Sequence, residues 1–148
     1  MFKHFRSLFL VTSSLLLVSA APPALSAGQD GPEYKYVLQI SDMDPSKQEL
    51  ILNNASNLLK AYPPGEVEVE VVAYGPGLRL MFADNANSKH LDSLAQSGVK
   101  FSACGNTIKG MTKLMGEAPK MNPSAGVVPA GVVRIGELVH QDYIYIKP

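Results

Sequence analysis

Short apolar segments alternate along the chain with longer segments whose apolar residues recur every three or four positions. The first kind is typical of β-strands and the second of amphipathic helices. Because parallel strands need crossover connections, this alternation predicts an α/β fold: a three-layer α/β/α sandwich around a five-stranded, mainly parallel, flavodoxin-like sheet. The expected strands are residues 34–40, 66–74, 99–104, 125–129 and 142–146, and the expected helices are 45–62, 88–98, 106–116 and 130–141.

Residues at the ends of the first two helices agree with this interpretation. Asp44 can cap the first helix and Pro45 can occupy its first turn. The segment 63–65, Pro-Pro-Gly, cannot continue that helix. We expect Ser88 to cap the second helix and Gly98 to end it.

Residues 1–27 have the pattern of an export signal. Lys3 and Arg6 precede the apolar run LFLVTSSLLLVSAA, and PPALSA then leads to Gly28. An uncleaved membrane anchor is the alternative, but the run is about 14 residues and a bilayer span needs about 20. We therefore expect a mature protein in the periplasm or outside the cell, without stable membrane insertion.

Removal of this signal would leave a flexible leader, residues 28–33, and one domain, residues 34–148. Without Lys3 and Arg6, 11 Lys and Arg remain against 13 Asp and Glu, a formal net charge of −2. With this charge balance the chain has no stripe of basic residues that could neutralise phosphates, so we expect no nucleic-acid partner. A single cysteine excludes an intramolecular disulfide. Packing, helped by self-association, must then stabilise the domain.

The carboxyl ends of the predicted strands are where open α/β sheets bind ligands. Four segments fall there: residues 41–44, 75–77, 104–107 and 129–131. Cys104 lies between a strand and a helix, and a helix N-terminus stabilises a thiolate. This position favours a reactive thiol. The alternative is a cysteine that only fills space in the core.

Sulfur and imidazole ligands for a metal are more weakly indicated. Met111, Met115 and Met121 could serve copper(I) together with the thiol. The first two are four residues apart, however, which is also the spacing of the core side of a helix. His90 and His140 fall on separate helices without zinc-site spacing, and a Cys–His catalytic pair is a minor alternative.

Two further segments have simple structural explanations. Gly-Pro-Gly at 75–77 resembles part of a phosphate loop, but the rest of that motif is missing and a tight turn explains it. Asp42 and Asp44 could bind a cation or act as bases, although helix capping accounts for Asp44. We expect no metal site and no cofactor.

Four segments carry a resemblance to the DsrE/DsrF-like sulfur-relay family, in its small exported branch. They are VLQISDMDPSKQELILNNASNLLKAY, VEVEVVAYGPGLRLM, SGVKFSACGNTIKG and GVVPAGVVRIGELVHQDYIYIKP. Each segment alone is weak, but their order and spacing from about Tyr36 to Pro148 make the match more specific. Two features depart from the family pattern. Its well-understood members are cytoplasmic, and their alanine-rich stretch after the cysteine is GNTIKG here.

The resemblance implies an α/β/α fold with a parallel sheet, assembled into a homotrimer or related homo-oligomer. It also implies that Cys104 accepts sulfane sulfur as a persulfide and passes it to the thiol of a partner protein. Gly105, Asn106 and Thr107 match the turn that would present this sulfur. Gly75 and Gly77 match a glycine turn of the family and would line the site without a catalytic role.

Two functions of different classes therefore remain open. In the first, the protein handles sulfur in the periplasm through Cys104. In the second, it is a non-catalytic oligomeric module that binds a small ligand or a redox partner, and Cys104 is structural. A copper scavenger is a minor third alternative.

Overall fold

The computed structural model describes residues 31–148. The predicted export signal, residues 1–27, lies outside the described part of the chain. Of the predicted leader only residues 31–33 are described, and they form neither helix nor strand. The domain predicted from residue 34 onward begins directly with the first strand.

All five predicted strands are present in one parallel sheet, which confirms the predicted fold class. The strand order is β4-β3-β2-β1-β5, so the central strands β1, β2 and β3 are covered most completely. Their burial agrees with the predicted apolar runs, since the last five residues of both β1 and β2 are buried. The strands are β1 (Tyr34–Ile40), β2 (Val67–Ala73), β3 (Lys100–Cys104), β4 (Ala125–Val128) and β5 (Ile144–Ile146).

The helices also follow the predicted order, with one correction at a helix start. Asp44 caps the first helix by accepting the Ser46 N–H, as expected. Ser88, in contrast, is the first residue of the second helix rather than its cap, because Asn87 occupies the cap position. Gly98, at φ +100°, ends that helix as predicted. The helices are α1 (Pro45–Ala61), α2 (Ser88–Gln96), α3 (Gly105–Met115) and α4 (Gly131–His140).

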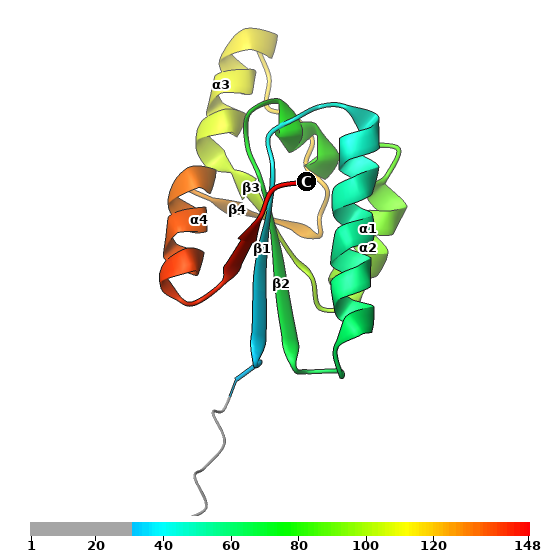
Figure 1. Cartoon of the computed structure of the whole chain (residues 1–148). Coiled ribbons are helices and arrows are strands. Elements are labelled where there is room, and N and C mark those ends of the chain that lie inside the picture. Colours follow the sequence, from blue (N-terminus) through cyan, green and yellow to red (C-terminus); the bar gives the residue numbers. More distant parts are fainter. Residues whose placement is uncertain (1–30) are drawn as a thin grey trace, which may run out of the picture.

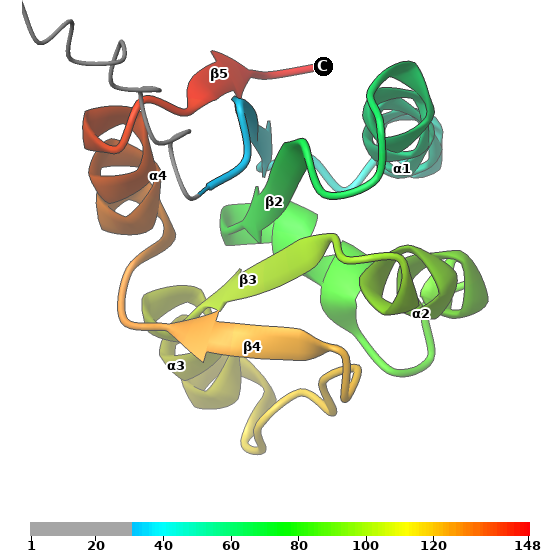
Figure 2. The ribbon, with the colours of Figure 1, turned by 90° about the horizontal axis from the view of Figure 1, so that it is seen from below.

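Helices cover the two faces of the sheet unequally. Figures 1 and 2 show α1 and α2 on one face and α4 on the other. The face under α1 and α2 holds the larger core, in which Ile51, Leu52 and Leu91 contact the strands. The face under α4 has a much smaller apolar cluster of Val37, Val72, Leu138 and Tyr143. The α4 face therefore relies more on polar contacts.

The last strand is shorter than predicted. Asp142 was expected to begin it, but its backbone has φ 67° and forms the turn after α4. The strand begins only at Ile144, beside Tyr36 of β1. Left-handed backbone is tolerated by aspartate better than by most side chains, so the residue suits the turn.

Residues 75–81 form a regular element that the sequence did not predict. After β2 the chain turns into a 3-10 helix, η1 (Gly75–Met81), whose Leu78, Leu80 and Met81 are fully buried. A Cβ at Gly77 would lie 2.6 Å from the Ile40 carbonyl. Only glycine allows η1 to approach the end of β1 this closely.

The helix that follows Cys104 extends beyond the sheet. Figure 1 shows α3 continuing past the carboxyl ends of the strands. None of its 11 residues is buried, and Leu114 is 88% exposed.

Within residues 31–148, no helix is long and apolar enough to cross a membrane.

Candidate functional site

Cys104 is the last residue of β3 and the residue that precedes α3. The parallel register places the ends of β1, β2 and β4 at the same edge of the sheet. This is the edge at which ligands were expected. The cysteine is 5% exposed, so its surroundings are mostly protein atoms.

The groups around the thiol favour its ionised form. Burial raises the pKa of Cys104, but hydrogen bonds to the sulfur outweigh that effect and lower the pKa below its ordinary value. The donors are the Thr107 hydroxyl and the backbone N–H groups of Gly131, Thr107 and Asn106. The Asn106 N–H also contacts the Pro129 carbonyl, at 3.2 Å. A thiolate held in this way is the nucleophilic form of cysteine.

Two helix N-termini meet at this sulfur. Thr107 and Asn106 belong to the first turn of α3, and Gly131 is the first residue of α4. Ala130, at the N-cap of α4, supplies no side-chain cap. The first N–H groups of a helix lack internal acceptors and carry partial positive charge, so both helices stabilise negative charge on Cys104.

Thr107 also connects Cys104 to the turn after β2. Its hydroxyl oxygen accepts the Gly75 N–H at 2.9 Å, which leaves the hydroxyl proton free to point at the sulfur. Gly75 has φ +55°, a conformation that glycine adopts easily. The structure thus brings Gly75 and Thr107 together with Cys104.

Gly105 and Gly77 have a different relation to the thiol. A Cβ at Gly105 would lie 3.1 Å from the Val128 carbonyl, so this glycine lets α3 begin against β4. Gly77 packs against the end of β1 rather than against Cys104. Both shape the backbone around the site.

Sequence reasoning missed Glu70 and Arg134, and it named Gly131 only as part of the segment 129–131. Gly131 donates to the thiolate, and a Cβ on it would lie 3.3 Å from the Cys104 Cβ. Glu70 and Arg134 form an ion pair between the centre of β2 and α4. The segment 129–131 was expected at the ligand end of the sheet, but its contact with Cys104 depends on how α4 packs. The signal for Glu70 is an acidic residue within the buried part of β2, residues 69–73.

The histidines of the described residues lie far from the thiol. His140 ends α4, whose first residue contacts Cys104, and nine helical steps separate the two ends by roughly 13 Å. His90 lines a groove with Gly65 and Val67, at the opposite end of the sheet. Neither histidine therefore forms a pair with Cys104.

The methionines do not gather into a metal site. Met111 and Met121 pack against the main core, and Met115 is 50% exposed. Across residues 31–148, no three His, Cys, Asp or Glu side chains come close enough to hold a metal ion.

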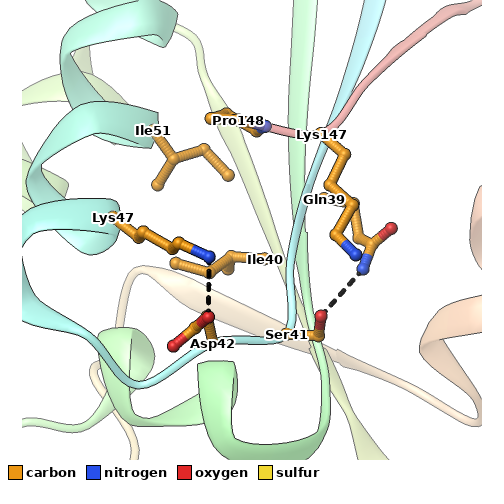
Figure 3. Close-up of a pocket in the computed structure, with 8 residues that line it drawn as sticks. All are labelled: Gln39, Ile40, Ser41, Asp42, Lys47, Ile51, Lys147 and Pro148. Atoms are coloured by element: carbon orange, nitrogen blue, oxygen red, sulfur yellow. Dashed lines mark hydrogen bonds and ion pairs between the residues drawn. The ribbon is translucent and has the colours of Figure 1, made fainter.

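A second crevice lies at the ends of β1 and β5, where the strand order reverses. Figure 3 shows Asp42 pointing at Lys47, with 2.8 Å between Oδ2 and Nζ, and Ser41 bonded to Gln39. Asp44 is occupied by capping α1. The cavity is ≈ 60 Å³. Small-molecule pockets are usually about 300–1,000 Å³, so this crevice has room only for water or a small ion.

A larger groove flanks the Cys104 site. It is ≈ 340 Å³ and runs along the loop from β4 into the first turns of α4. Apolar side chains line one part of the groove, and the ion pair between Arg134 and Glu137 lines the other part. The lining residues are Val128, Pro129, Ala130, Val133, Arg134 and Glu137.

Comparison with known proteins identifies the fold but not an activity. The solved structure of MTH1491, a protein of unknown function from Methanobacterium thermoautotrophicum, is 30% identical to this chain with a TM-score of 0.70. The match covers 78% of this chain and 99% of that one. No family model matches the sequence, and no curated protein matches it. The DsrE/DsrF-like resemblance therefore stays a prediction.

Proposed function

The chain belongs to the same family as MTH1491, whose function is unknown, and we propose from its own residues that it is a sulfur-handling protein. In this proposal Cys104 accepts a sulfane sulfur as a persulfide and transfers it to the thiol of a partner protein. The supporting observation is the position of Cys104 at the N-termini of α3 and α4, where the Thr107 hydroxyl and nearby backbone N–H groups lower its pKa. Sulfur transfer needs such a stabilised thiolate.

The first step is a displacement on the sulfur donor. The Cys104 thiolate attacks the outer sulfur of thiosulfate, a sulfur–sulfur bond forms, and the donor's sulfur–sulfur bond breaks with release of sulfite. The product is the Cys104 persulfide anion, and total charge is conserved. A polysulfide reacts in the same way and leaves one sulfur atom shorter.

The second step returns the thiolate. A thiolate of the partner protein attacks the outer sulfur of the persulfide, and the electron pair of the broken bond returns to the Cys104 sulfur. The Thr107 hydroxyl and the Gly131 N–H stabilise negative charge on that sulfur. They therefore favour Cys104 as the leaving group.

Mass spectrometry of the intact protein after incubation with thiosulfate or polysulfide tests this function. We expect a mass increase of one sulfur atom that dithiothreitol removes. The Cys104→Ser variant is the matched control, because the substituted residue cannot form a persulfide. Absence of the increase in the wild type, or its persistence in the variant, would refute the proposal.

The low exposure of Cys104, 5%, favours a second candidate function. In a non-catalytic binding module the cysteine would only pack beneath a ligand or partner surface. Alkylation of the native protein across a pH series separates the two. A reactive thiol is modified rapidly below its reference pKa of about 8.5, whereas a packing cysteine reacts slowly throughout.

We also propose that the protein acts outside the cytoplasm. The support is the order of basic, apolar and small residues in positions 1–27. Expression of the full chain followed by N-terminal sequencing of the periplasmic fraction tests this. The expected first residue is Gly28, and retention of Met1 in a membrane fraction would contradict it.

Self-association is the last part of the proposal. Several large apolar side chains are exposed around α3, β4 and the start of α4, where they would contact a second copy. Burial of such side chains is the main driving force for association. The residues are Leu114 at 88%, Met115 at 50%, Val127 at 61%, Val132 at 66% and Val133 at 56% exposure.

A further inference from the structure

A buried carboxylate lies on the sheet face beneath α4. Glu70, in the middle of β2, is 0% exposed. Its Oε1 accepts from the Arg134 Nε at 2.8 Å and from the Ser102 hydroxyl at 2.6 Å. Its Oε2 accepts from the Arg134 NH2 group at 2.8 Å. The guanidinium thus grips both carboxylate oxygens, and Ser102 fixes the carboxylate from the neighbouring strand.

These bonds lie directly behind the Cys104 site. Ser102 and Cys104 are two residues apart on β3, so their side chains point to the same face of the sheet. Arg134 is three residues after Gly131, which places both on the side of α4 that faces the sheet. One turn of α4 therefore contacts Cys104 through Gly131 and Glu70 through Arg134.

The apolar cluster beneath α4 does not by itself fix the position of the helix along the sheet. Leu138 packs against Val37, Val72 and Tyr143 in a small apolar cluster. Apolar contacts of this kind have no directional preference. A bidentate guanidinium–carboxylate pair does, because its two parallel bonds require one geometry. The ion pair thus adds a directional contact to the short β4–α4 loop and the close packing of Gly131, which also place the first turn of α4.

Small displacements of this turn matter at Gly131. A Cβ on that residue would be 3.2 Å from the Tyr74 side chain and 3.3 Å from the Cys104 Cβ, so the backbone is packed closely against both. The Gly131 N–H lies at this close contact and is one of the groups that lower the Cys104 pKa. A slide or tilt of α4 would move this N–H away from Cys104.

We propose that Glu70 and Arg134 are positioning residues that hold the N-terminus of α4 against Cys104, so that the Gly131 N–H points at the sulfur. They do not touch the sulfur themselves. The inference rests on the proposed function only in that the thiolate is the reactive form. It predicts a measurable change in the Cys104 pKa from substitutions at Glu70 and at Arg134, which lies one helix turn after Gly131.

A direct effect of the Glu70 charge and a positioning effect would shift the Cys104 pKa in opposite directions. Removing the negative charge of Glu70 alone would make a nearby thiolate more favourable and lower the Cys104 pKa. Loss of positioning would move the Gly131 N–H away from the sulfur and would therefore raise the Cys104 pKa. Arg134→Lys keeps the charge but loses the bidentate fork, so a pure charge effect leaves the pKa unchanged and positioning again raises it.

The experiment is titration of the Cys104 thiolate by its ultraviolet absorbance in the full chain. We expect Glu70→Gln and Arg134→Lys each to raise the Cys104 pKa by about one pH unit, a tenfold loss of thiolate below the pKa. Circular dichroism reports whether each variant folds. Since removal of one partner from a buried pair destabilises a fold, the milder Arg134→Lys decides if Glu70→Gln does not fold.

Glu68→Gln is the matched control. Glu68 lies two residues earlier on β2, on the same face, and pairs with Lys100 of β3 rather than with α4. We expect it to leave the Cys104 pKa unchanged. The variants also leave in place Tyr74, Tyr143 and Glu137, the other ionisable side chains near Gly131, Glu70 or Arg134.

A fall in the pKa with Glu70→Gln, or no change with Arg134→Lys, overturns the positioning role. The pKa can be measured whether or not the protein takes up sulfur. Failure of sulfur uptake with shifted pKa values would refute the proposed function alone, and sulfur uptake with unshifted values would refute the positioning role alone.

Discussion

Two influences act on Cys104 in opposite directions. Burial disfavours the charged thiolate, and the donors on Thr107, Asn106 and Gly131 favour it more strongly. Each donor belongs to a residue at a helix start, so the charge is stabilised without a neighbouring cation in contact with the sulfur. This balance between burial and hydrogen-bond donors depends on the geometry of the two loops that lead into α3 and α4, and not on the residue type alone.

The hydroxyl of Thr107 can be tested by its removal. Thr107→Val keeps the shape of the side chain but deletes the donor to the sulfur, so we expect a higher Cys104 pKa and slower alkylation at neutral pH. Thr112→Val is the control, since the Thr112 hydroxyl on the same helix bonds only the Ile108 carbonyl. Equal alkylation rates in the two variants would show that Thr107 does not act on the thiol.

The lowered pKa of Cys104 also predicts how stability depends on pH. A group whose pKa is lower in the folded state adds stability above its unfolded value, about 8.5, and loses it as the pH falls through the folded value. We therefore expect the free energy of unfolding of the wild type, relative to Cys104→Ser, to rise with pH through this window. Urea titrations over a pH series measure it, and a flat difference would contradict the lowered pKa.

At the scale of elements, the site depends on how η1, α3 and α4 begin. Gly77 lets η1 contact the end of β1, Gly105 lets α3 begin beside β4, and Gly131 lets α4 begin beside Cys104. At all three positions a side chain would meet a neighbouring atom. These glycines allow the three loops to converge at one edge of the sheet.

Gly77→Ala tests the contact between η1 and β1. The new Cβ would lie 2.6 Å from the Ile40 carbonyl carbon and 2.7 Å from the Ser41 Cα, so backbone must move. We expect a loss of about 2 kcal/mol or more of unfolding free energy, as for other overpacked sites.

Gly110→Ala is the control for this substitution. Gly110 lies inside α3, and a Cβ added there would have no neighbouring atom within 4 Å outside its own helix turn. Alanine should stabilise the helix there by about 0.5–1 kcal/mol. Chemical denaturation measures both variants, and a neutral Gly77→Ala would mean that the close approach is absent in solution.

At the scale of the whole molecule, one side of the sheet is left incomplete. The edge strand β4 has two exposed residues among its four, and α3 projects past the sheet with no buried residue. Unpaired edge strands are sites at which chains associate. Of the exposed apolar residues, Val127, Val132 and Val133 lie next to the β4–α4 loop that contacts Cys104, so association there would cover part of the site.

Leu114→Lys tests this association. Leu114 on α3 is 88% exposed, and a charge there should dissociate the oligomer by burying an unpaired cation at the interface. Leu50→Lys on α1, where Leu50 is 45% exposed, is the control and should leave the oligomer intact. Analytical ultracentrifugation measures both, and a wild-type monomer would refute self-association.

The order of strands and helices was determined by the sequence alone. Periodicity and breaker residues located β1, α1 and β3, because these features act locally along the chain. The same local reasoning placed Cys104 at a strand end before a helix. That reasoning missed η1, because the buried Leu78 and Leu80 are two residues apart and do not recur at helical spacing. It also misplaced the starts of α2 and β5 by one or two residues.

The tertiary structure alone decided what surrounds the sulfur. Gly131, 27 positions after Cys104 in the sequence, reaches it only because α4 packs across the sheet. The pair of Glu70 and Arg134 forms for the same reason. Local patterns state which residues can begin a helix or end a strand. Which of those ends meet depends on the packing of the sheet and its helices, and that packing lowers the pKa of the lone cysteine.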